Sequence, residues 1–197
     1  ILKFMKKYLV IGNQIDHSLS PKLHNHWIIK KKINAIYDKK KLQKDDLARI
    51  ISDVKENKIS GINVTVPFKK AVIPFLDELS TEAKETQSVN TIYLQDGKLS
   101  GHNTDIAGFE LAIKYAKFDI KNKKIFVLGA GGVTPSIIYS LKKMNVSKII
   151  LSNRTREKAL ELKNIFKDID IVEWGETVDF DMIVNTTSIG LKNDDGI

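Results

Sequence analysis

The 197-residue sequence contains no cysteine at all. This absence excludes disulfide bonds, catalysis by a thiolate and metal sites built from thiolates. Long apolar runs are also missing, because no stretch approaches the roughly 18 residues that a helix needs to cross a bilayer. The N-terminal stretch has early lysines, but its apolar run is too short for a signal peptide and no small-residue cleavage site follows. We therefore expect a cytoplasmic protein without membrane association, with Met5 as a candidate natural start.

Arginine is scarce as well, since only Arg49, Arg154 and Arg156 occur among the 32 basic side chains. The net charge of +8 is compatible with binding of nucleic acid or of an anionic substrate. However, the lysines are scattered and mixed with acidic residues, and no zinc-finger, RNA-recognition or helix-turn-helix pattern is present. A solvated, lysine-rich surface is the better interpretation, and we expect no nucleic-acid partner.

The four histidines do not form a metal-binding pattern. His24 and His26 are two positions apart on an expected helix, so their side chains point in different directions. His17 and His102 are isolated in the sequence. Core or surface positions suit these residues better than a metal site, and no metal is expected.

Strand-like and helix-like segments alternate along the chain. In the first half we expect strands over 8–12, 35–38 and 61–66, and a hairpin turn at Asp96-Gly97 between 91–94 and 99–101. One helix is expected to begin at Ser20-Pro21, with Ser20 as its N-cap and proline at the first helical position. A second is amphipathic, because apolar residues follow the helical repeat at Leu47, Ile50, Ile51 and Val54.

The second half alternates more regularly. Strands are expected over 124–128, 148–152, 169–172 and 181–184, with helices ending near Lys143 and spanning 156–166. Such alternation predicts an α/β protein whose sheets are mostly parallel, with helices on both faces. We place a domain boundary near Asn103 to Asp105, at the start of a connecting helix that runs through Lys117. The domains are then residues 1–104 and 105–197.

The first motif with chemical meaning is GAGG at 129–132, comprising Gly129, Ala130, Gly131 and Gly132. It follows an apolar strand and precedes a helix, so its backbone can approach a pyrophosphate at the helix N-terminus. The usual third glycine of such loops would fall at Thr134, so the match is imperfect. A plain tight turn is the alternative, but the strand–turn–helix context favours nucleotide binding.

The second motif is SNRTR at 152–156, at the end of the next strand. Folds that bind NAD usually carry an acidic residue here, which would repel a 2′-phosphate. Asn153, Arg154, Thr155 and Arg156 instead offer two guanidinium groups and further donors, which suit a phosphate. A merely basic helix start is the alternative, although it is unfavourable against the helix dipole. The pattern therefore indicates NADP in preference to NAD.

Three further motifs are expected at ligand-binding positions. NVTVPFKK at 63–70 brings Thr65 and Lys69 to the carboxyl edge of a sheet, where α/β proteins bind ligands. GHNTD at 101–105 enters a helix, so its polar residues suit either helix capping or a site. HSLSP at 17–21 carries two hydroxyl groups at Ser18 and Ser20, which are equally consistent with carboxylate binding and with an N-cap.

In this order, the motifs at 17–21, 63–69, 103–105, 129–132 and 153–155 resemble the shikimate dehydrogenase family. The resemblance extends from about Tyr8 to Leu191, and NTTSIG at 185–190, which includes Thr187 and Ser188, looks like the family's nicotinamide-side loop. It implies a three-layer α/β substrate domain followed by a Rossmann-type NADP domain. It also implies reversible oxidation of shikimate to 3-dehydroshikimate, a step of chorismate and aromatic amino-acid biosynthesis.

The resemblance also assigns roles to residues of this chain. Ser18 and Ser20 would hold the substrate carboxylate, and Thr65, Asn90 and Asp105 would bind the ring hydroxyls. Lys69 would lie beside the reacting hydroxyl, either as the general acid/base oriented by Asp105 or mainly as a hydrogen-bond donor. The cofactor contacts would come from 129–132, 153–156, Thr187 and Ser188.

Members of this family continue for some tens of residues beyond the point that matches Ile197, with a tyrosine near the nicotinamide and a glutamine on the substrate. We therefore expect an unfinished sheet edge with exposed apolar surface. The alternatives are a quinate/shikimate dehydrogenase of broader specificity and a non-catalytic nucleotide-binding module. Monomer and homodimer are both compatible with the sequence.

Overall fold

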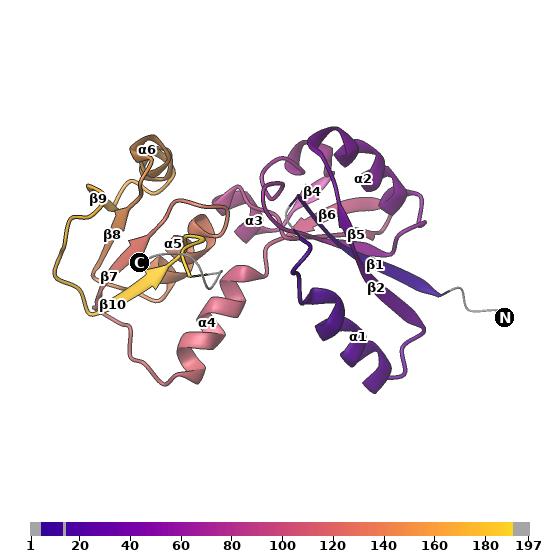
Figure 1. The fold of residues 1–197 in the computed structure, drawn as a ribbon, viewed down its shortest axis with the longest axis horizontal. Helices are drawn as coiled ribbons and strands as arrows, with labels where there is room; N and C mark the ends of the chain where they lie inside the picture. The colour runs from indigo at the N-terminus through magenta and orange to yellow at the C-terminus, as the bar shows by residue number, and fades with distance from the viewer. Residues whose placement is uncertain (1–4, 14, 191–197) are drawn as a thin grey trace. The chain divides into compact units, whose positions relative to one another are not determined.

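The computed structural model describes residues 5–13 and 15–190 of the chain. The chain divides into two compact units, one ending at Thr104 and the other beginning at Asp105 (Figure 1). None of the helices in these described ranges is long and apolar enough to cross a membrane. Leu191, at the end of the family resemblance, lies outside the described residues.

The first unit is built on a six-stranded sheet. Its strands are β1 (Lys6–Gly12), β2 (Ala35–Lys41), β3 (Gly61–Val64), β4 (Glu78–Leu79), β5 (Thr91–Gln95) and β6 (Lys98–His102). Their order in the sheet is β2-β1-β3-β5-β6-β4. β1 pairs in parallel with β2 and β3, and β4 with β6, whereas β5 is antiparallel to both of its neighbours. The carboxyl ends of β1 and β3 therefore lie at the same edge.

Helices complete this unit as layers around the sheet. They are α1 (Ser20–Lys30), α2 (Leu47–Lys55) and α3 (Thr81–Thr86), with short 3-10 turns η1 (Lys44–Asp46) and η2 (Ile73–Phe75). In Figure 1, α2 lies above β1 and β2, and α1 lies below them. The four apolar residues of the expected amphipathic helix are all buried on α2, which confirms that pattern. None of the residues of α1 is buried.

Local details of the first unit depart from the expected boundaries. Leu19 is the N-cap of α1, so the expectation that Ser20 caps this helix is wrong, and Ser20 is instead its first residue. β3 ends at Val64, before the cis Val66-Pro67 bond, rather than at Val66. The expected hairpin turn is present, with φ angles of 51° at Asp96 and 77° at Gly97, the left-handed pair of a type I′ turn.

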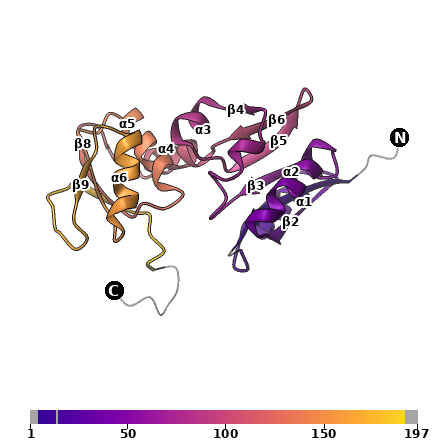
Figure 2. The same cartoon turned by 90° about the horizontal axis from the view of Figure 1, so that it is seen from above.

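The second unit contains a four-stranded parallel sheet. Its strands are β7 (Lys124–Leu128), β8 (Lys148–Ser152), β9 (Asp170–Val172) and β10 (Met182–Asn185), and its helices are α4 (Asp105–Tyr115), α5 (Thr134–Lys143) and α6 (Arg156–Ile165). The strand order is β10-β7-β8-β9. Figure 2 shows α6 beside β8 and β9. Apolar residues of β7, β8, α5 and α6 form one buried cluster, as the alternating pattern predicts.

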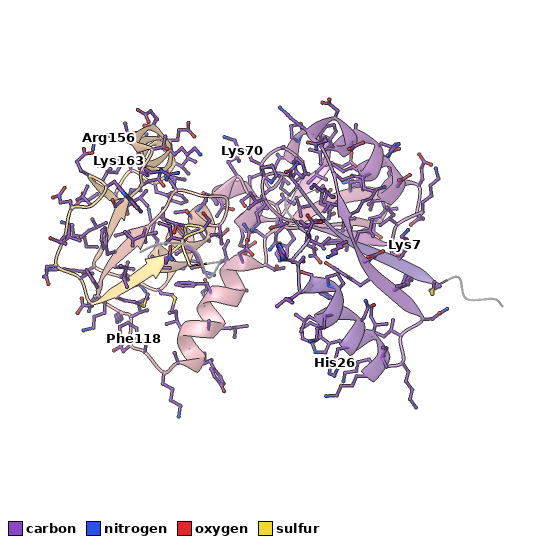
Figure 3. The ribbon with its side chains drawn as sticks, viewed as in Figure 1. Lys7, His26, Lys70, Phe118, Arg156 and Lys163 are labelled. Carbon is purple, nitrogen blue, oxygen red and sulfur yellow. The ribbon has the colours of Figure 1, made fainter. Side chains whose placement is uncertain are left out.

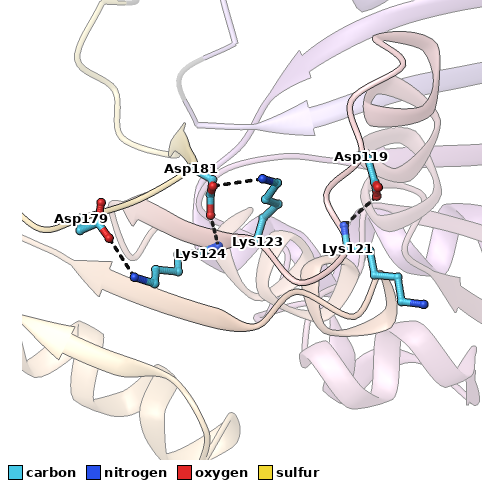
Figure 4. Close-up of polar contacts among 6 residues, drawn as sticks. All are labelled: Asp119, Lys121, Lys123, Lys124, Asp179 and Asp181. Carbon is cyan, nitrogen blue, oxygen red and sulfur yellow. Dashed lines mark hydrogen bonds and ion pairs between the residues drawn. The ribbon is translucent and has the colours of Figure 1, made fainter.

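Ion pairs and a hydrogen bond link the start of β10 to the start of β7 (Figure 4). The Asp181 carboxylate accepts a 2.8 Å hydrogen bond from the Lys124 amide and pairs with the Lys123 ammonium at 3.2 Å. The backbone hydrogen bond and this ammonium hold the pKa of Asp181 below its usual range. The Asp179 carboxylate lies 2.8 Å from the Lys124 ammonium. β10 forms an edge of the described sheet, and Ile183 on it is 48% exposed.

Candidate functional site

Candidate residues occur in both units, and those of the first unit gather where β1 and β3 end. The chain after β3 returns to β1, because the Thr65 amide donates to the Ile11 carbonyl at 2.9 Å and Val66 accepts from the Asn13 amide at 3.2 Å. The Thr65 side chain is half-buried. Thr65 thus lies at the carboxyl edge of the sheet, where the sequence predicts a ligand.

Lys69 follows in the same loop. Phe68 just before it is 3% exposed and anchors the loop in the core, and the Lys69 carbonyl accepts from the Val89 amide at 2.9 Å. The loop is therefore fixed on both sides of the lysine, whose side chain is half-buried. Its neighbour Lys70 is exposed, and Figure 3 shows that side chain among the surface residues.

The two serines of the first loop share a short turn. The Ser20 amide donates to the Ser18 hydroxyl oxygen at 3.3 Å, and the Ser18 amide donates to the Ile15 carbonyl at 3.0 Å. Ile15 is 3% exposed, so the turn is tied to the core. Both serine side chains are half-buried. The Ser18 oxygen accepts this backbone hydrogen bond, and its hydroxyl can still donate to another acceptor such as a carboxylate.

Tyr37 on β2 is a residue of this region that sequence reasoning missed. It is 5% exposed, and its hydroxyl donates to Asn63 Oδ1 at 2.7 Å. Burial raises the pKa of Tyr37 to about 12, although a hydrogen bond from the Ser20 side chain acts in the opposite direction. Tyr37 therefore lies beside two of the loops that carry candidate substrate contacts.

The helix α1 holds Tyr37 from two sides. The Asn25 side chain bonds both the Tyr37 carbonyl at 2.7 Å and the Tyr37 amide at 3.0 Å. The His24 ring stacks on the phenol with centroids 4.2 Å apart and an interplanar angle of 10°. Partial burial lowers the pKa of His24, which favours its neutral form in this stack. His24 thus has a packing role, as the sequence suggested for its histidines.

A polar network continues from Asn63 to the end of β6. Asn63 Nδ2 donates to the Asn90 carbonyl at 3.2 Å and to the Thr91 hydroxyl at 3.1 Å. The Asn90 side-chain amide donates to the Thr104 hydroxyl at 2.9 Å, and Asn90 Oδ1 accepts from the Thr104 amide at 3.0 Å. Asn90 is 9% exposed, so its side chain has a fixed orientation. Asn63 is the first residue of the motif at 63–70, and it lies between the buried Ile62 and Val64.

The segment at 101–105 provides more than helix capping. Asn103 is 1% exposed, and its amide donates to the Ser88 carbonyl at 2.9 Å and to the Thr86 hydroxyl at 3.2 Å, which ties it to the end of α3. Asp105 is the first residue of α4 and is half-buried. A carboxylate in the first turn of a helix is stabilised by the helix dipole.

In the second unit, the glycine loop leaves β7 in a conformation that side chains rarely adopt. Gly129 has a φ of 103°, and a Cβ there would lie 2.8 Å from Thr187 Cγ2 and 2.9 Å from the Thr186 hydroxyl. The amides that follow lead directly into α5, which begins at Thr134. Glycine is therefore needed here for two reasons: its backbone adopts a positive φ, and a side chain would collide with the loop after β10.

Thr134 takes the place of a third glycine, and the structure explains why. It is fully buried, and its hydroxyl donates to the Gly129 carbonyl at 3.1 Å and lies 2.9 Å from the Thr186 hydroxyl. Thr186 in turn donates from its amide to the Leu128 carbonyl at 2.7 Å. A threonine at this position thus links the glycine loop to the loop after β10, and the imperfect motif is compatible with a rigid loop.

Asn153 links the glycine loop to the loop after β8. Its Oδ1 accepts from the Ala130 amide at 2.9 Å, and its Nδ2 donates to the Thr155 carbonyl at 2.6 Å. Arg154, between these partners, is exposed. One amide side chain therefore links the two loops.

A pocket of about 250 Å³ follows this edge of the sheet. It is lined by most of the predicted cofactor residues, together with others after β10: Gly129, Ala130, Gly131, Asn153, Arg154, Thr155, Thr186, Thr187, Ser188 and Ile189. Lys158 and Trp174 also line it, and sequence reasoning missed both. For Lys158, the signal was a further cation in the first turn of α6, where the helix dipole disfavours it.

Two predicted cofactor residues are not part of this lining. Gly132 is outside the lining. Arg156, labelled in Figure 3, is the first residue of α6, and its guanidinium forms an ion pair with the Glu173 carboxylate. Among the described residues, Arg154 and Lys158 are therefore the cations that line the pocket. Within the described ranges, no cluster of three or more histidine, aspartate or glutamate side chains could hold a metal ion.

Known proteins show the same two-part organisation. Residues 10–92 match the family model "Shikimate dehydrogenase substrate binding domain", and residues 110–188 match "Shikimate / quinate 5-dehydrogenase". The chain is 59% identical to the shikimate dehydrogenase (NADP(+)) of Pelagibacter ubique, over 98% of this chain and 72% of that protein. It is 43% identical to the Aquifex aeolicus protein of the same name, over 95% of this chain and 70% of the relative.

Solved structures agree with these matches. The crystal structure of shikimate dehydrogenase from Aquifex aeolicus superimposes with a TM-score of 0.92 at 41% identity, over 100% of this chain and 74% of that one. The Thermus thermophilus shikimate 5-dehydrogenase, solved in complex with NADP(H) and shikimate, gives a TM-score of 0.86 at 30% identity. That match covers 95% of this chain and 70% of the other.

Proposed function

Because the chain belongs to the shikimate dehydrogenase family, we propose that it catalyses the NADP-dependent, reversible oxidation of shikimate to 3-dehydroshikimate. The observation that carries this proposal is the presence of two sets of polar residues, one in each unit. The first set, around Thr65 and Lys69, suits a hydroxylated carboxylate, and the second, around Gly129 and Arg154, suits a phosphorylated dinucleotide.

The pocket of the second unit fits NADP. The glycine loop that follows β7 leads into the N-terminus of α5, where backbone amides can bind a pyrophosphate, and Gly129 lets this loop pass close to Thr186 and Thr187. Arg154 and Lys158 offer cations for the 2′-phosphate, and none of the described residues that line the pocket is acidic and would repel it. Thr187 and Ser188 after β10 would contact the nicotinamide half. When bound, NADP supplies the hydride acceptor for the oxidation.

In the first unit, the proposed roles follow the chemistry of each side chain. The Ser18 and Ser20 hydroxyls would donate to the carboxylate of shikimate, with Ser20 giving up its hydrogen bond to Tyr37 to do so, and Thr65, Asn90 and Asp105 would bind ring hydroxyls. Lys69 would exchange a proton with the reacting hydroxyl oxygen, taking it during oxidation and returning it during reduction. Asp105 would orient Lys69 and the substrate.

The direct test follows absorbance at the reduced-nicotinamide band in the presence of this chain. Shikimate with NADP is expected to give a signal, shikimate with NAD a much weaker one, and quinate with NADP serves as the test of broader specificity. Equal rates with shikimate and quinate would support the broader alternative. Equal rates with NAD would contradict the role of Arg154 and Lys158, and absence of any signal would contradict the proposed activity of this chain.

Lys69→Ala tests the proton-transfer role, and Lys70→Ala is its matched control because the neighbouring lysine is exposed. The first substitution is expected to lower kcat about 10²–10⁴-fold with unchanged affinity for NADP. The second is expected to leave kcat within about twofold, as for a surface position. Similar losses in both variants would remove Lys69 from the mechanism.

A cytoplasmic location and a monomeric or homodimeric state stay predictions.

A further inference from the structure

The pocket of the second unit runs along four consecutive loops at the carboxyl edge of the sheet. In the strand order β10-β7-β8-β9, its lining comes from 186–189, then 129–131, then 153–155, and finally Trp174 after β9. A dinucleotide placed here has its pyrophosphate at the glycine loop and its adenosine ribose at the end of β8. The adenine, which is attached to that ribose, then extends toward β9 and reaches the position of Trp174.

Trp174 is suited to such a contact. It is the one aromatic residue among the described residues that line the pocket, and it is 41% exposed, so part of its indole surface is free of protein contacts. Aromatic faces stack on nucleobases, and an exposed apolar ring in a polar pocket gains by being covered.

The loop that carries Trp174 is held in place at both sides of the tryptophan. The Glu173 carbonyl accepts from the Ser152 hydroxyl at 3.0 Å, and Ser152 is 1% exposed at the end of β8. The Glu173 amide donates to the Glu176 carboxylate at 3.1 Å, and Gly175 takes a φ of 89°. Arg156 adds its ion pair to the Glu173 side chain. These contacts fix the backbone from which the indole projects.

We propose that Trp174 is the stacking surface for the adenine of NADP, and that Arg156 is a positioning residue that acts through Glu173 rather than a ligand of the 2′-phosphate. This inference rests on the proposed function, because it assigns an additional residue to the same cofactor. It gives the cations near this loop different roles: Arg154 and Lys158 line the pocket and would bind the cofactor, and Arg156, outside the lining, supports the loop that carries the ring.

Intrinsic fluorescence tests the stacking directly, because the chain has only two tryptophans, Trp27 and Trp174. In a Trp27→Phe variant, Trp174 is the sole reporter, and adenosine 2′,5′-bisphosphate is the probe. We expect saturable quenching by this probe and none by nicotinamide mononucleotide, which lacks adenine. The matched control is Trp174→Phe, in which Trp27 of the other unit is expected to give no response.

Calorimetry of the same titrations separates this inference from the proposed function. Heat of binding with unchanged Trp174 emission would overturn the stacking role while cofactor binding stands. Neither heat nor quenching would overturn both. In addition, Trp174→Ala is expected to weaken binding of the probe about tenfold, and Trp174→Phe is expected to retain most of the affinity, since a ring remains. Equal losses in both variants would contradict stacking.

The role of Arg156 is tested by a double-mutant cycle with Glu173. If Arg156 acts through Glu173, Arg156→Ala and Glu173→Ala each shift the emission of Trp174, and the double variant is no weaker in binding than either single one. Direct contact with the 2′-phosphate predicts a different result. Arg156→Ala would then weaken binding of adenosine 2′,5′-bisphosphate but not of adenosine 5′-monophosphate, and Glu173→Ala would have no effect. That outcome would overturn the positioning role.

Discussion

Removal of the Tyr37 hydroxyl should change how the first unit responds to alkaline pH. At about pH 8, Tyr37→Phe leaves Asn63 Oδ1 without its 2.7 Å donor, which is expected to cost about 1 kcal/mol of unfolding free energy. The ring that remains can still stack against His24, so the packing of α1 on β2 should persist. The variant is therefore expected to fold, with slightly lower stability than the wild type.

Above about pH 11 the order of the two stabilities should reverse. The pKa of Tyr37 is raised from 10.0 to about 12 in the folded protein, so the unfolded chain loses the phenol proton first. The stability that comes from the neutral phenol is complete below pH 10 and is lost as the pH rises toward 12. A difference of two pKa units corresponds to at most about 2.7 kcal/mol of unfolding free energy, which the wild type loses at high pH. The phenylalanine variant has no phenol and therefore has no such loss. The two stability curves should then cross near about pH 11.

Urea unfolding at several pH values measures this difference. A Trp174→Phe background leaves Trp27 on α1 as the only fluorescent tryptophan, and its ring lies 5.7 Å from that of His24, close to the substituted position. The signal therefore reports on the first unit. Lysines titrate in the same range in both proteins, so only the difference between the two curves counts. Parallel curves from pH 9 to 12 would show that burial of Tyr37 does not control its ionisation, and would refute the reasoning.

Three further substitutions test other parts of the fold. Gly129→Ala places a methyl group 2.8 Å from Thr187 Cγ2 at a φ of 103°, so we expect at least about a tenfold higher Kd for NADP by calorimetry, and an unchanged Kd would contradict the close-approach role. Ile138→Ala empties a fully buried position on α5 and should cost about 2–5 kcal/mol in urea unfolding, whereas a loss below 1 kcal/mol would mean that the core collapses around it. Asp179→Ala breaks only an exposed ion pair with Lys124, so a change in unfolding free energy above about 1 kcal/mol would be unexpected.

The sequence was most informative where structure depends on neighbouring residues. Strands β7 and β8 have the bounds that their apolar runs predict, because each run is bordered by lysine or by a loop motif. The hairpin at Asp96-Gly97 likewise follows from two residues that accept positive φ. By contrast, β4 has two residues and α3 has six. These elements are too short to show the two-residue repeat of a strand or the roughly 3.6-residue repeat of a helix in the sequence.

Contacts between distant residues limited the prediction of the site. Tyr37 and Asn63 are 26 positions apart, and no pattern within β2 or β3 indicates that their side chains meet. Arg156 belongs to a basic motif that suggests phosphate binding, but its partner Glu173 is 17 positions away and belongs to another loop. Trp174 follows β9 in a turn whose position depends on the buried Ser152. The motifs therefore indicated the type of site more completely than the residues that shape it.

The edge position of β10 has a consequence for the dynamics of the cofactor pocket. Among the described strands, β10 pairs with β7 alone, and the polar contacts of Thr186 with Leu128 and Gly129 continue that attachment into the pocket. An edge strand of four residues is expected to open locally far more often than the buried β7, so its amides should exchange with solvent faster. Because Thr187 and Ser188 line the pocket only while β10 is attached, any ligand that needs them slows this exchange in proportion to its occupancy. Amide exchange in β10 would therefore report on cofactor binding without any turnover.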